Sequence, residues 1–322
     1  MNAFTSLVSM AISTLIMFSA MVVFAETGLR LFRIKQGRLR AIIRLLPFIA
    51  LLSDFFLANW QTGASLNPLH CSSCAQNLIE TLLHVKLNQL LITENTYTLL
   101  QSGFWLFISA TAFQILKILF ELFLANKNLL KLEQTAILNR RNIENRLLKE
   151  ALKKYNARIF ASSSINIPIA TYANAIFLPE KIAENSPQEE FEAIIAHELE
   201  HLIWRDPALK VITSFASAFF WWLPVNSWIK KLELEQEIAC DQSIGKYGID
   251  KIFLAEAIVK AAAAANKRSE KIICYLSHAS HQVLNRLYHL HKNTIQSEQY
   301  ERVSLAIFTI GLTTALTCFW ML

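Results

Sequence analysis

Glycine, proline and charged residues are all scarce in this sequence. The 322 residues include seven glycines and seven prolines, and only 17% are charged whereas 53% are hydrophobic. This balance excludes an ordinary soluble globular protein and is typical of membrane proteins. The long apolar stretches contain no clusters of turn-forming residues, so we expect the segments that cross the membrane to be helices rather than strands of a barrel. The sequence therefore predicts a mainly α, integral membrane protein.

Long apolar runs predict four transmembrane helices, since about 20 apolar residues cross the hydrocarbon core of a bilayer. They cover about residues 4–25, 41–60, 98–120 and 303–322. No Lys or Arg precedes the first run, so we expect a retained span rather than a cleaved signal peptide. The second run contains Asp54, which is either a functional carboxylate inside the bilayer or a solvated one near its outer end.

Lysine and arginine are unevenly distributed around these spans. Both the loop after the first span and the segment after the third are rich in cations, whereas residues 61–97 carry only Lys86. The positive-inside rule then places both termini outside the inner membrane of a bacterial-type cell. Residues 1–125 form the predicted membrane domain and residues 126–302 a cytoplasmic domain. The net charge of +6 is explained by cations next to the spans, which are attracted to anionic membrane lipid. No direct nucleic-acid partner is expected.

Cysteine is also sparse. Of the five cysteines in the chain, only Cys71 and Cys74 lie close together in the sequence. On the predicted outer loop, this pair favours a short disulfide over a metal or redox site. None of the five has the setting of a catalytic nucleophile.

The predicted cytoplasmic domain mixes helix and strand signals. Residues 126–155 carry leucines at helical spacing and predict a connecting helix, whereas residues 158–180 are rich in β-branched and aromatic residues and predict two short strands. A further helix should begin at Ser186, with Pro187 in its first turn and Glu189 completing a capping box. The domain is therefore predicted to be α+β.

The stretch "AHELEH" sets two histidines four residues apart around a glutamate. On a helix, His197 and His201 share one face at a spacing that suits one zinc ion, and Glu198 lies one step round. Two imidazoles hold such an ion, an open position takes water, and the carboxylate removes a proton from that water as it attacks a carbonyl. The alternative is a helix face that merely carries two histidines.

A catalytic zinc ion needs a third protein ligand, and "LELEQEIACD" offers acidic residues at intervals of four. Glu237 is the predicted ligand, with Glu233 or Glu235 as alternatives. Asp241, one turn beyond Glu237, is predicted to contact the outer nitrogen of a ligating histidine.

The two motifs are separated by residues 211–229, which carry no formal charge and are long enough to form a fifth span. A full crossing would put His197 and Glu237 on opposite sides of the membrane. We therefore predict an apolar hairpin that turns at Pro224 and either dips into the membrane or packs on the spans.

The combination of "AIIAHELEHLIWRDP" and "LELEQEIACDQSI" resembles the membrane zinc metallopeptidases of the β-lactam-sensing antirepressor type. The resemblance takes in nearly the whole chain, and it implies three spans, a cytoplasmic gluzincin domain and a fourth span. It also implies an edge strand that aligns an extended substrate by main-chain hydrogen bonds. The resemblance implies that a single Zn²⁺ is bound by His197, His201 and Glu237. It implies that Glu198 is the general base and that Asp241 supports a ligating histidine. The edge strand would contain Asn174, Ala175 and Ile176.

The function implied by this resemblance is a membrane-embedded zinc endopeptidase that cleaves a protein substrate, such as a transcriptional repressor or another membrane protein. The best-known members continue into an extracellular penicillin-binding sensor, whereas this chain stops at Leu322. We therefore expect its signal to enter through the spans, the outer loop or a separate sensor protein. A quality-control protease for membrane proteins and a non-catalytic receptor or scaffold are the alternatives. Tyr275, His278 and Arg286 are candidates for stabilising the oxyanion that the reaction forms.

Overall fold

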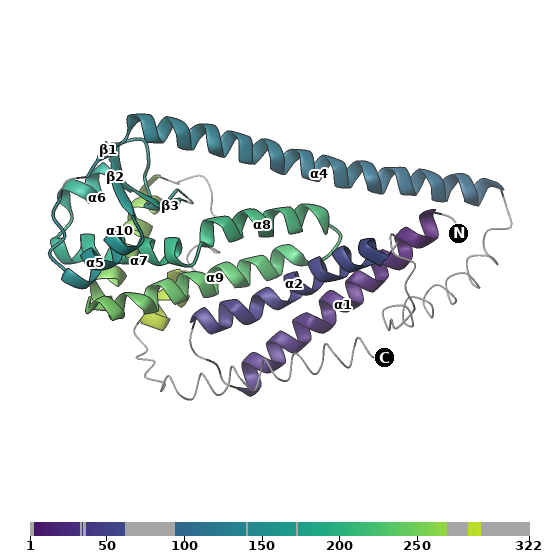
Figure 1. The fold of residues 1–322 in the computed structure, drawn as a ribbon, viewed down its shortest axis with the longest axis horizontal. Coiled ribbons are helices and arrows are strands. Elements are labelled where there is room, and N and C mark those ends of the chain that lie inside the picture. Colours follow the sequence, from purple (N-terminus) through teal and green to yellow (C-terminus); the bar gives the residue numbers. More distant parts are fainter. Residues whose placement is uncertain are drawn as a thin grey trace. The chain divides into compact units, whose positions relative to one another are not determined.

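The computed structural model describes residues 3–32, 34, 37–61, 94–139, 141–171, 173–268 and 283–290 (Figure 1). The chain divides into two compact units. One unit comprises Met1–Lys117, Ala216–Trp228 and Gln296–Leu322, and the other comprises Ile118–Phe215 and Ile229–Ile295. The predicted fourth span, the Cys71–Cys74 pair, Tyr275 and His278 lie outside the described residues.

The first unit is helical. Helices α1 (Ala3–Leu31) and α2 (Gly37–Gln61) pack against each other, and the buried Arg44 of α2 forms an ion pair with Glu26 of α1 at 2.9 Å (Figure 1). Trp228 donates a hydrogen bond from its indole nitrogen to the Arg44 carbonyl oxygen at 2.7 Å. Segment 216–228 is therefore tied to α2 by a buried polar contact.

Two described segments are long and apolar enough to cross a membrane. They are Thr14–Leu31 in α1 and Gln101–Thr135 in α4 (Glu94–Thr135). The predicted span 41–60 does form a helix within α2, where Asp54 lies. The fold is mostly helical with a small sheet, as predicted, whereas the arrangement of four spans stays a prediction.

The second unit contains a four-stranded mixed sheet. Its strands are β1 (Ile137–Leu138), β2 (Arg158–Ser162), β3 (Ile169–Thr171) and β4 (Ala175–Pro179), in the order β1-β2-β4-β3. Strand β2 runs parallel to β4, and the other two pairs are antiparallel. Two strands were predicted in residues 158–180, where the structure has three.

The connecting helix predicted over residues 126–155 is wrong. Helix α4 ends at Thr135, β1 follows, and a separate helix α5 (Arg146–Lys154) begins after Asn145. The Asn145 side chain accepts a hydrogen bond from the Leu148 amide and so caps α5. Asparagine favours such a cap over a helix interior, which explains why the chain starts a new helix there.

The sheet order also corrects the prediction of the substrate-binding edge. Strand β4 lies between β2 and β3, and Ala175 and Ile176 are completely buried. Asn174, just before β4, bonds through its carbonyl oxygen to the Arg158 amide of β2. Residues 174–176 therefore offer no edge to a substrate. Among the described strands, β3 and β1 are the two edges.

Helix α7 (Gln188–Ile203) is the central element of this unit. It contacts α5, β3, β4, η1 (Ile244–Tyr247) and α10 (Lys251–Arg268). Its Phe191, Ile195 and Leu199 are fully buried in the main hydrophobic cluster, together with Leu148 and Ile176. The helix that carries "HELEH" is therefore fixed by packing on several sides.

The beginning of α7 differs from the prediction. Its N-cap is Pro187, and Ser186 instead caps the end of α6 (Glu180–Asn185), so the predicted capping box with Glu189 is wrong. The guanidinium of Arg141 stabilises this corner by donating to the Ser186 carbonyl oxygen at 2.8 Å and to the Gln188 side chain at 3.1 Å. A residue distant in sequence thus holds the junction between α6 and α7, and α7 has no side-chain cap.

Residues 211–229 do not form one continuous helix. Helix α8 (Asp206–Phe219) ends before a turn over residues 220–224, and helix α9 (Val225–Ser243) follows Pro224 directly. In the first unit, the Ser217 hydroxyl donates to the Asn226 side chain at 2.6 Å across this turn. In the second unit, Gln236 donates to Asp206 at 3.0 Å. The chain therefore turns back, and α9 returns Glu237 toward α7.

Candidate metal centre

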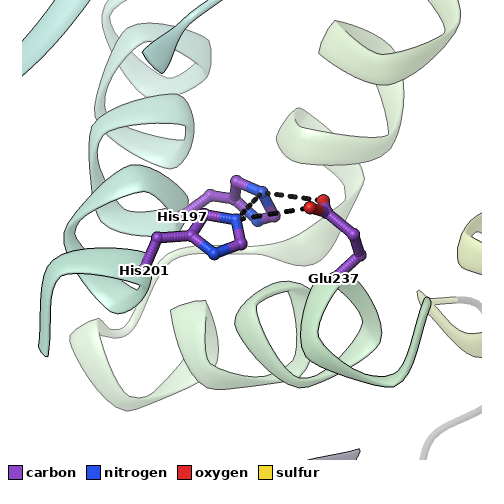
Figure 2. Close-up of side chains that lie close together, drawn as sticks. All are labelled: His197, His201 and Glu237. Atoms are coloured by element: carbon purple, nitrogen blue, oxygen red, sulfur yellow. Dashed lines mark hydrogen bonds and ion pairs between the residues drawn. The ribbon is translucent and has the colours of Figure 1, made fainter. Parts of the chain in front are cut away.

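Helix α7 places His197 and His201 one turn apart on one face. Their Nε2 atoms are 3.2 Å apart, and their ring centroids are separated by 4.8 Å (Figure 2). Both side chains are buried, as is Glu198 between them. Burying three polar side chains in one helix is costly unless each has a partner, so the arrangement indicates a built site rather than a helix face that merely carries histidines.

Glu237 of α9 completes a cluster of three ligand atoms. Its two carboxylate oxygens lie 3.5 Å from Nε2 of His197 and 3.6 Å from Nε2 of His201 (Figure 2). All three ligand atoms lie within 4.8 Å of one another. Two imidazole nitrogens and one carboxylate oxygen fit the ligand set of a catalytic zinc ion, which leaves a further position open. Neither Glu233 nor Glu235 belongs to a metal-binding group among the described residues.

A carboxylate supports the outer nitrogen of each histidine. Asp241 lies with Oδ1 2.9 Å from Nδ1 of His197, although this contact is not aligned as a hydrogen bond. Asp206 lies with Oδ2 2.8 Å from Nδ1 of His201. A carboxylate at Nδ1 keeps the proton on that atom and leaves the Nε2 lone pair facing the metal position. Asp241 lies where the sequence placed it, whereas Asp206 was not predicted.

Asp206 went unnoticed because it stands just before Pro207, and a proline at that place predicts only the end of the preceding helix. The structure instead starts α8 at Asp206 and buries its side chain beside His201 and Gln236. The short distance in sequence between Asp206 and His201 was the only available signal.

Arg286, in the helical segment 283–290, contacts two acidic residues of α9, Glu237 and Asp241. Its guanidinium donates to the two Asp241 oxygens at 2.8 and 2.7 Å and lies 3.1 Å from a Glu237 oxygen. The sequence suggested Arg286 as an oxyanion donor. In the structure it neutralises and orients the carboxylates that face the histidines, and it also lines the cavity beside them, so the oxyanion role stays a prediction.

The charges of the centre favour ionised carboxylates. In the metal-free centre, burial alone would lower the pKa of His197, but the carboxylates of Asp241 and Glu237 outweigh burial and raise that pKa to about 9. A metal ion that binds Nε2 therefore displaces a proton from His197. Burial alone would raise the pKa of Glu237, but His197, His201 and Arg286 hold that pKa well below its ordinary value. The pKa of Asp241 is lowered in the same way, with Arg286 as the main opposing charge. The acidic groups are therefore negative at neutral pH.

A second candidate group shares His201 with the first. Cys240 lies with its sulfur 3.3 Å from Nδ1 of His201 and 3.8 Å from an oxygen of Asp206. A neutral imidazole offers one lone pair, so His201 binds a metal through either Nε2 or Nδ1. Asp206 favours a proton on Nδ1, which directs the lone pair to the group formed with His197 and Glu237.

The centre opens into a cavity of about 870 Å³. Glu198 lines this cavity beside His197, His201 and Glu237. A carboxylate next to a metal position and in an open cavity has the placement that a general base requires. The remaining walls come from the segment before β3, from β3, α6, α7, α8 and α10, and from residues 283, 284 and 286.

Comparison with known proteins identifies the family of the chain. The family model described as BlaR1 peptidase M56 matches residues 38–290. No curated protein matches the chain. The matched range contains every residue of the centre described above, and it confirms the family resemblance noted in the sequence.

Proposed function

The chain belongs to the BlaR1 peptidase M56 family, and we propose that it is a zinc-dependent endopeptidase held in a membrane. Membership of this family indicates a metallopeptidase, that is, a metal-dependent hydrolase of peptide bonds. The observation that carries the proposal for this chain is the convergence of His197, His201 and Glu237 beside Glu198 in an open cavity. This donor set suits zinc better than magnesium or calcium, which prefer oxygen ligands alone.

Each residue has a distinct role in the proposed reaction. His197, His201 and Glu237 hold the ion, which when bound supplies Lewis-acid activation of water and of the scissile carbonyl. Glu198 accepts a proton from the attacking water and passes it to the leaving amine. Asp241 and Asp206 keep the two imidazoles in the tautomer that binds metal, and Arg286 holds Asp241 and Glu237 in place.

The proposed substrate-binding edge is β3. It lies at one end of the sheet, contacts α7, and lines the cavity through Ile169 and Ala170. An extended peptide laid along such an edge bonds to its main chain irrespective of sequence. The scissile bond would then lie beside Glu198.

The proposed biological role is cleavage of a cytoplasmic or membrane regulatory protein, such as a repressor, in response to a signal. The family match and the two apolar helices support a membrane location. The four-span topology, with both termini outside and the peptidase in the cytoplasm, is proposed from the charge distribution.

The proposal is tested with the full-length chain purified in detergent, alongside Glu198→Gln. We expect both proteins to contain about one zinc ion, because Glu198 is not a ligand, and only the wild type to cleave itself or casein. Loss of a general base typically costs about 10²–10⁴-fold in rate. Zinc in both proteins with equal cleavage by both would refute the role of Glu198. Zinc in both with cleavage by neither would favour a scaffold.

A further inference from the structure

Cys240 of α9 carries a thiol that the proposed reaction does not use. The residue is completely buried, and its sulfur lies 3.3 Å from Nδ1 of His201 and 3.8 Å from Oδ2 of Asp206. That oxygen lies 2.8 Å from the same Nδ1 atom. A sulfur, a nitrogen and an oxygen, each of them a common metal ligand, therefore meet at one point inside the second unit.

The separations of these three atoms are close to those of ligands around one ion. Ligands that bind zinc tetrahedrally at about 2.0–2.3 Å are about 3.3–3.7 Å apart from one another. The sulfur–nitrogen distance lies within this range and the sulfur–oxygen distance just above it, whereas the nitrogen and the oxygen would have to separate by about 0.5 Å. A buried cysteine commonly packs as a small apolar residue, but the sulfur of Cys240 contacts a nitrogen and an oxygen.

The sulfur makes this group chemically different from the catalytic one. The group of His197, His201 and Glu237 offers only nitrogen and oxygen atoms, which suit zinc. A thiolate is a softer ligand and selects thiophilic ions. Such an ion would arrive through the open cavity, because His201 and Asp206 line it and Cys240 lies directly against both.

His201 belongs to both groups, and as a neutral imidazole it has only one lone pair to offer. In the catalytic arrangement its proton is on Nδ1 beside Asp206, so Nε2 faces the zinc position. An ion that binds Nδ1 forces this proton onto Nε2, which then no longer binds zinc. In the exchange one divalent ion enters, one zinc ion leaves, and the Cys240 thiol releases its proton to solvent as its sulfur binds the ion. The two groups are therefore mutually exclusive.

We propose that Cys240, Asp206 and Nδ1 of His201 form a second, inhibitory metal site for thiophilic divalent cations such as Cd²⁺, and that an ion in this site excludes zinc from the catalytic group. The binding does not depend on the proposed peptidase function, whereas the inhibition rests on it. The site gives soft ions a way to inactivate the centre without occupying the position of the catalytic ion.

The first test follows zinc rather than activity. The zinc-loaded full chain in detergent is titrated with Cd²⁺, free metal is removed, and bound zinc and cadmium are measured by mass spectrometry. Loss of a supporting contact alone lowers metal affinity about 10–100-fold, so loss of the sulfur in Cys240→Ser should raise the Cd²⁺ concentration that displaces half of the zinc at least about 10-fold. Equal concentrations for the wild type and Cys240→Ser would overturn the inference.

The second test observes the sulfur directly. Cadmium bound to a thiolate gives a charge-transfer absorption in the ultraviolet, and the difference between the wild type and Cys240→Ser separates the contribution of Cys240 from that of the other four cysteines. We expect this absorption to grow in step with the release of zinc. Cys274→Ser is the matched control and should behave as the wild type in both tests. If Cys240→Ser holds no zinc before Cd²⁺ is added, Cys240→Ala is measured in its place.

Three results are distinguishable. If zinc release and the absorption both depend on Cys240, the inference holds. If Cys240 binds cadmium while zinc stays in place, the two groups are not exclusive and the inference fails. If cadmium displaces zinc through Cys240 in a wild type that never cleaves casein, the proposed function fails while the second site stands.

Discussion

At the scale of single residues, the centre depends on groups that face away from the metal position. His197 and His201 each point one nitrogen toward Glu237 and the other toward an aspartate. The sequence was sufficient to single out the three proposed ligands that the structure brings together, because "HELEH" and "EIACD" follow helical spacing. It was not sufficient for Asp206 or Arg286, because their contacts depend on how α8 and the segment 283–290 pack against α7 and α9.

Replacement of Asp206 should weaken metal binding without removing a ligand. Asp206→Asn keeps the shape of the side chain but loses the charge that holds the proton of His201 on Nδ1. Loss of such a supporting contact typically lowers metal affinity about 10–100-fold. Competition for zinc with a chromogenic chelator measures the change. The exposed Glu150→Gln on α5 is the control, and a value for Asp206→Asn equal to that of the control would contradict the role.

Replacement of Arg286 should destabilise the protein as well as the metal site. Arg286→Gln leaves the buried Asp241 charge without its guanidinium partner, and breaking a buried pair in this way costs about 3–5 kcal/mol. Arg286→Lys keeps the charge but not the two parallel bonds, so its effect should be smaller.

The measurement for Arg286 is chemical unfolding of the metal-free protein. Asp241→Asn in the Arg286→Gln background should recover part of the loss, because the unpaired charge is then removed. Equal stability of the wild type and Arg286→Gln would show that the ion pair contributes nothing.

At the scale of elements, the second unit is organised around α7. Its neighbours include α5, whose Leu148 is fully buried while the adjacent Leu147 is half exposed. Much of the secondary structure of this unit was predictable from hydrophobic periodicity, as the helix over "EEFEAIIAHELEHL" and the strands of residues 158–180 show. The sheet order was not predictable, because no local pattern distinguishes a central strand such as β4 from an edge such as β3.

The packing of α5 gives a paired prediction. Leu148→Ala should lower the free energy of unfolding by about 2–5 kcal/mol, since it opens a cavity in the core. Leu147→Ala, one residue earlier, should change it by less than about 0.5 kcal/mol. Denaturant titration of the two variants in parallel measures both values. Similar losses for the two would show that α5 does not pack through Leu148.

At the scale of the whole molecule, a bound metal would join α7 to α9, which are separated in the sequence by α8. The mainly helical architecture and the return of the chain near Pro224 could be predicted, because apolar length, helix periodicity and proline are local signals. The number of spans was not settled by the same signals, since only two described helices meet the requirements for crossing a membrane.

Zinc should therefore stabilise the fold as well as catalyse. A ligand that binds only the folded state at about 1,000 times its dissociation constant adds about 4 kcal/mol to stability. We expect a chelator to lower the melting temperature of the wild type and of Glu198→Gln by similar amounts. It should have little effect on His201→Ala, which lacks a ligand. A chelator effect on His201→Ala as large as on the wild type would contradict this coupling.

The central claim is that zinc is bound by His197, His201 and Glu237, and not by the neighbouring His201–Asp206–Cys240 group. Zinc X-ray absorption on the purified full-length chain tests this claim most directly. The account predicts a shell of nitrogen and oxygen ligands at about 2.0–2.1 Å, with a signature of imidazole and no sulfur. A sulfur ligand at about 2.3 Å would place the ion at Cys240 and contradict the account, as would a protein that binds no zinc.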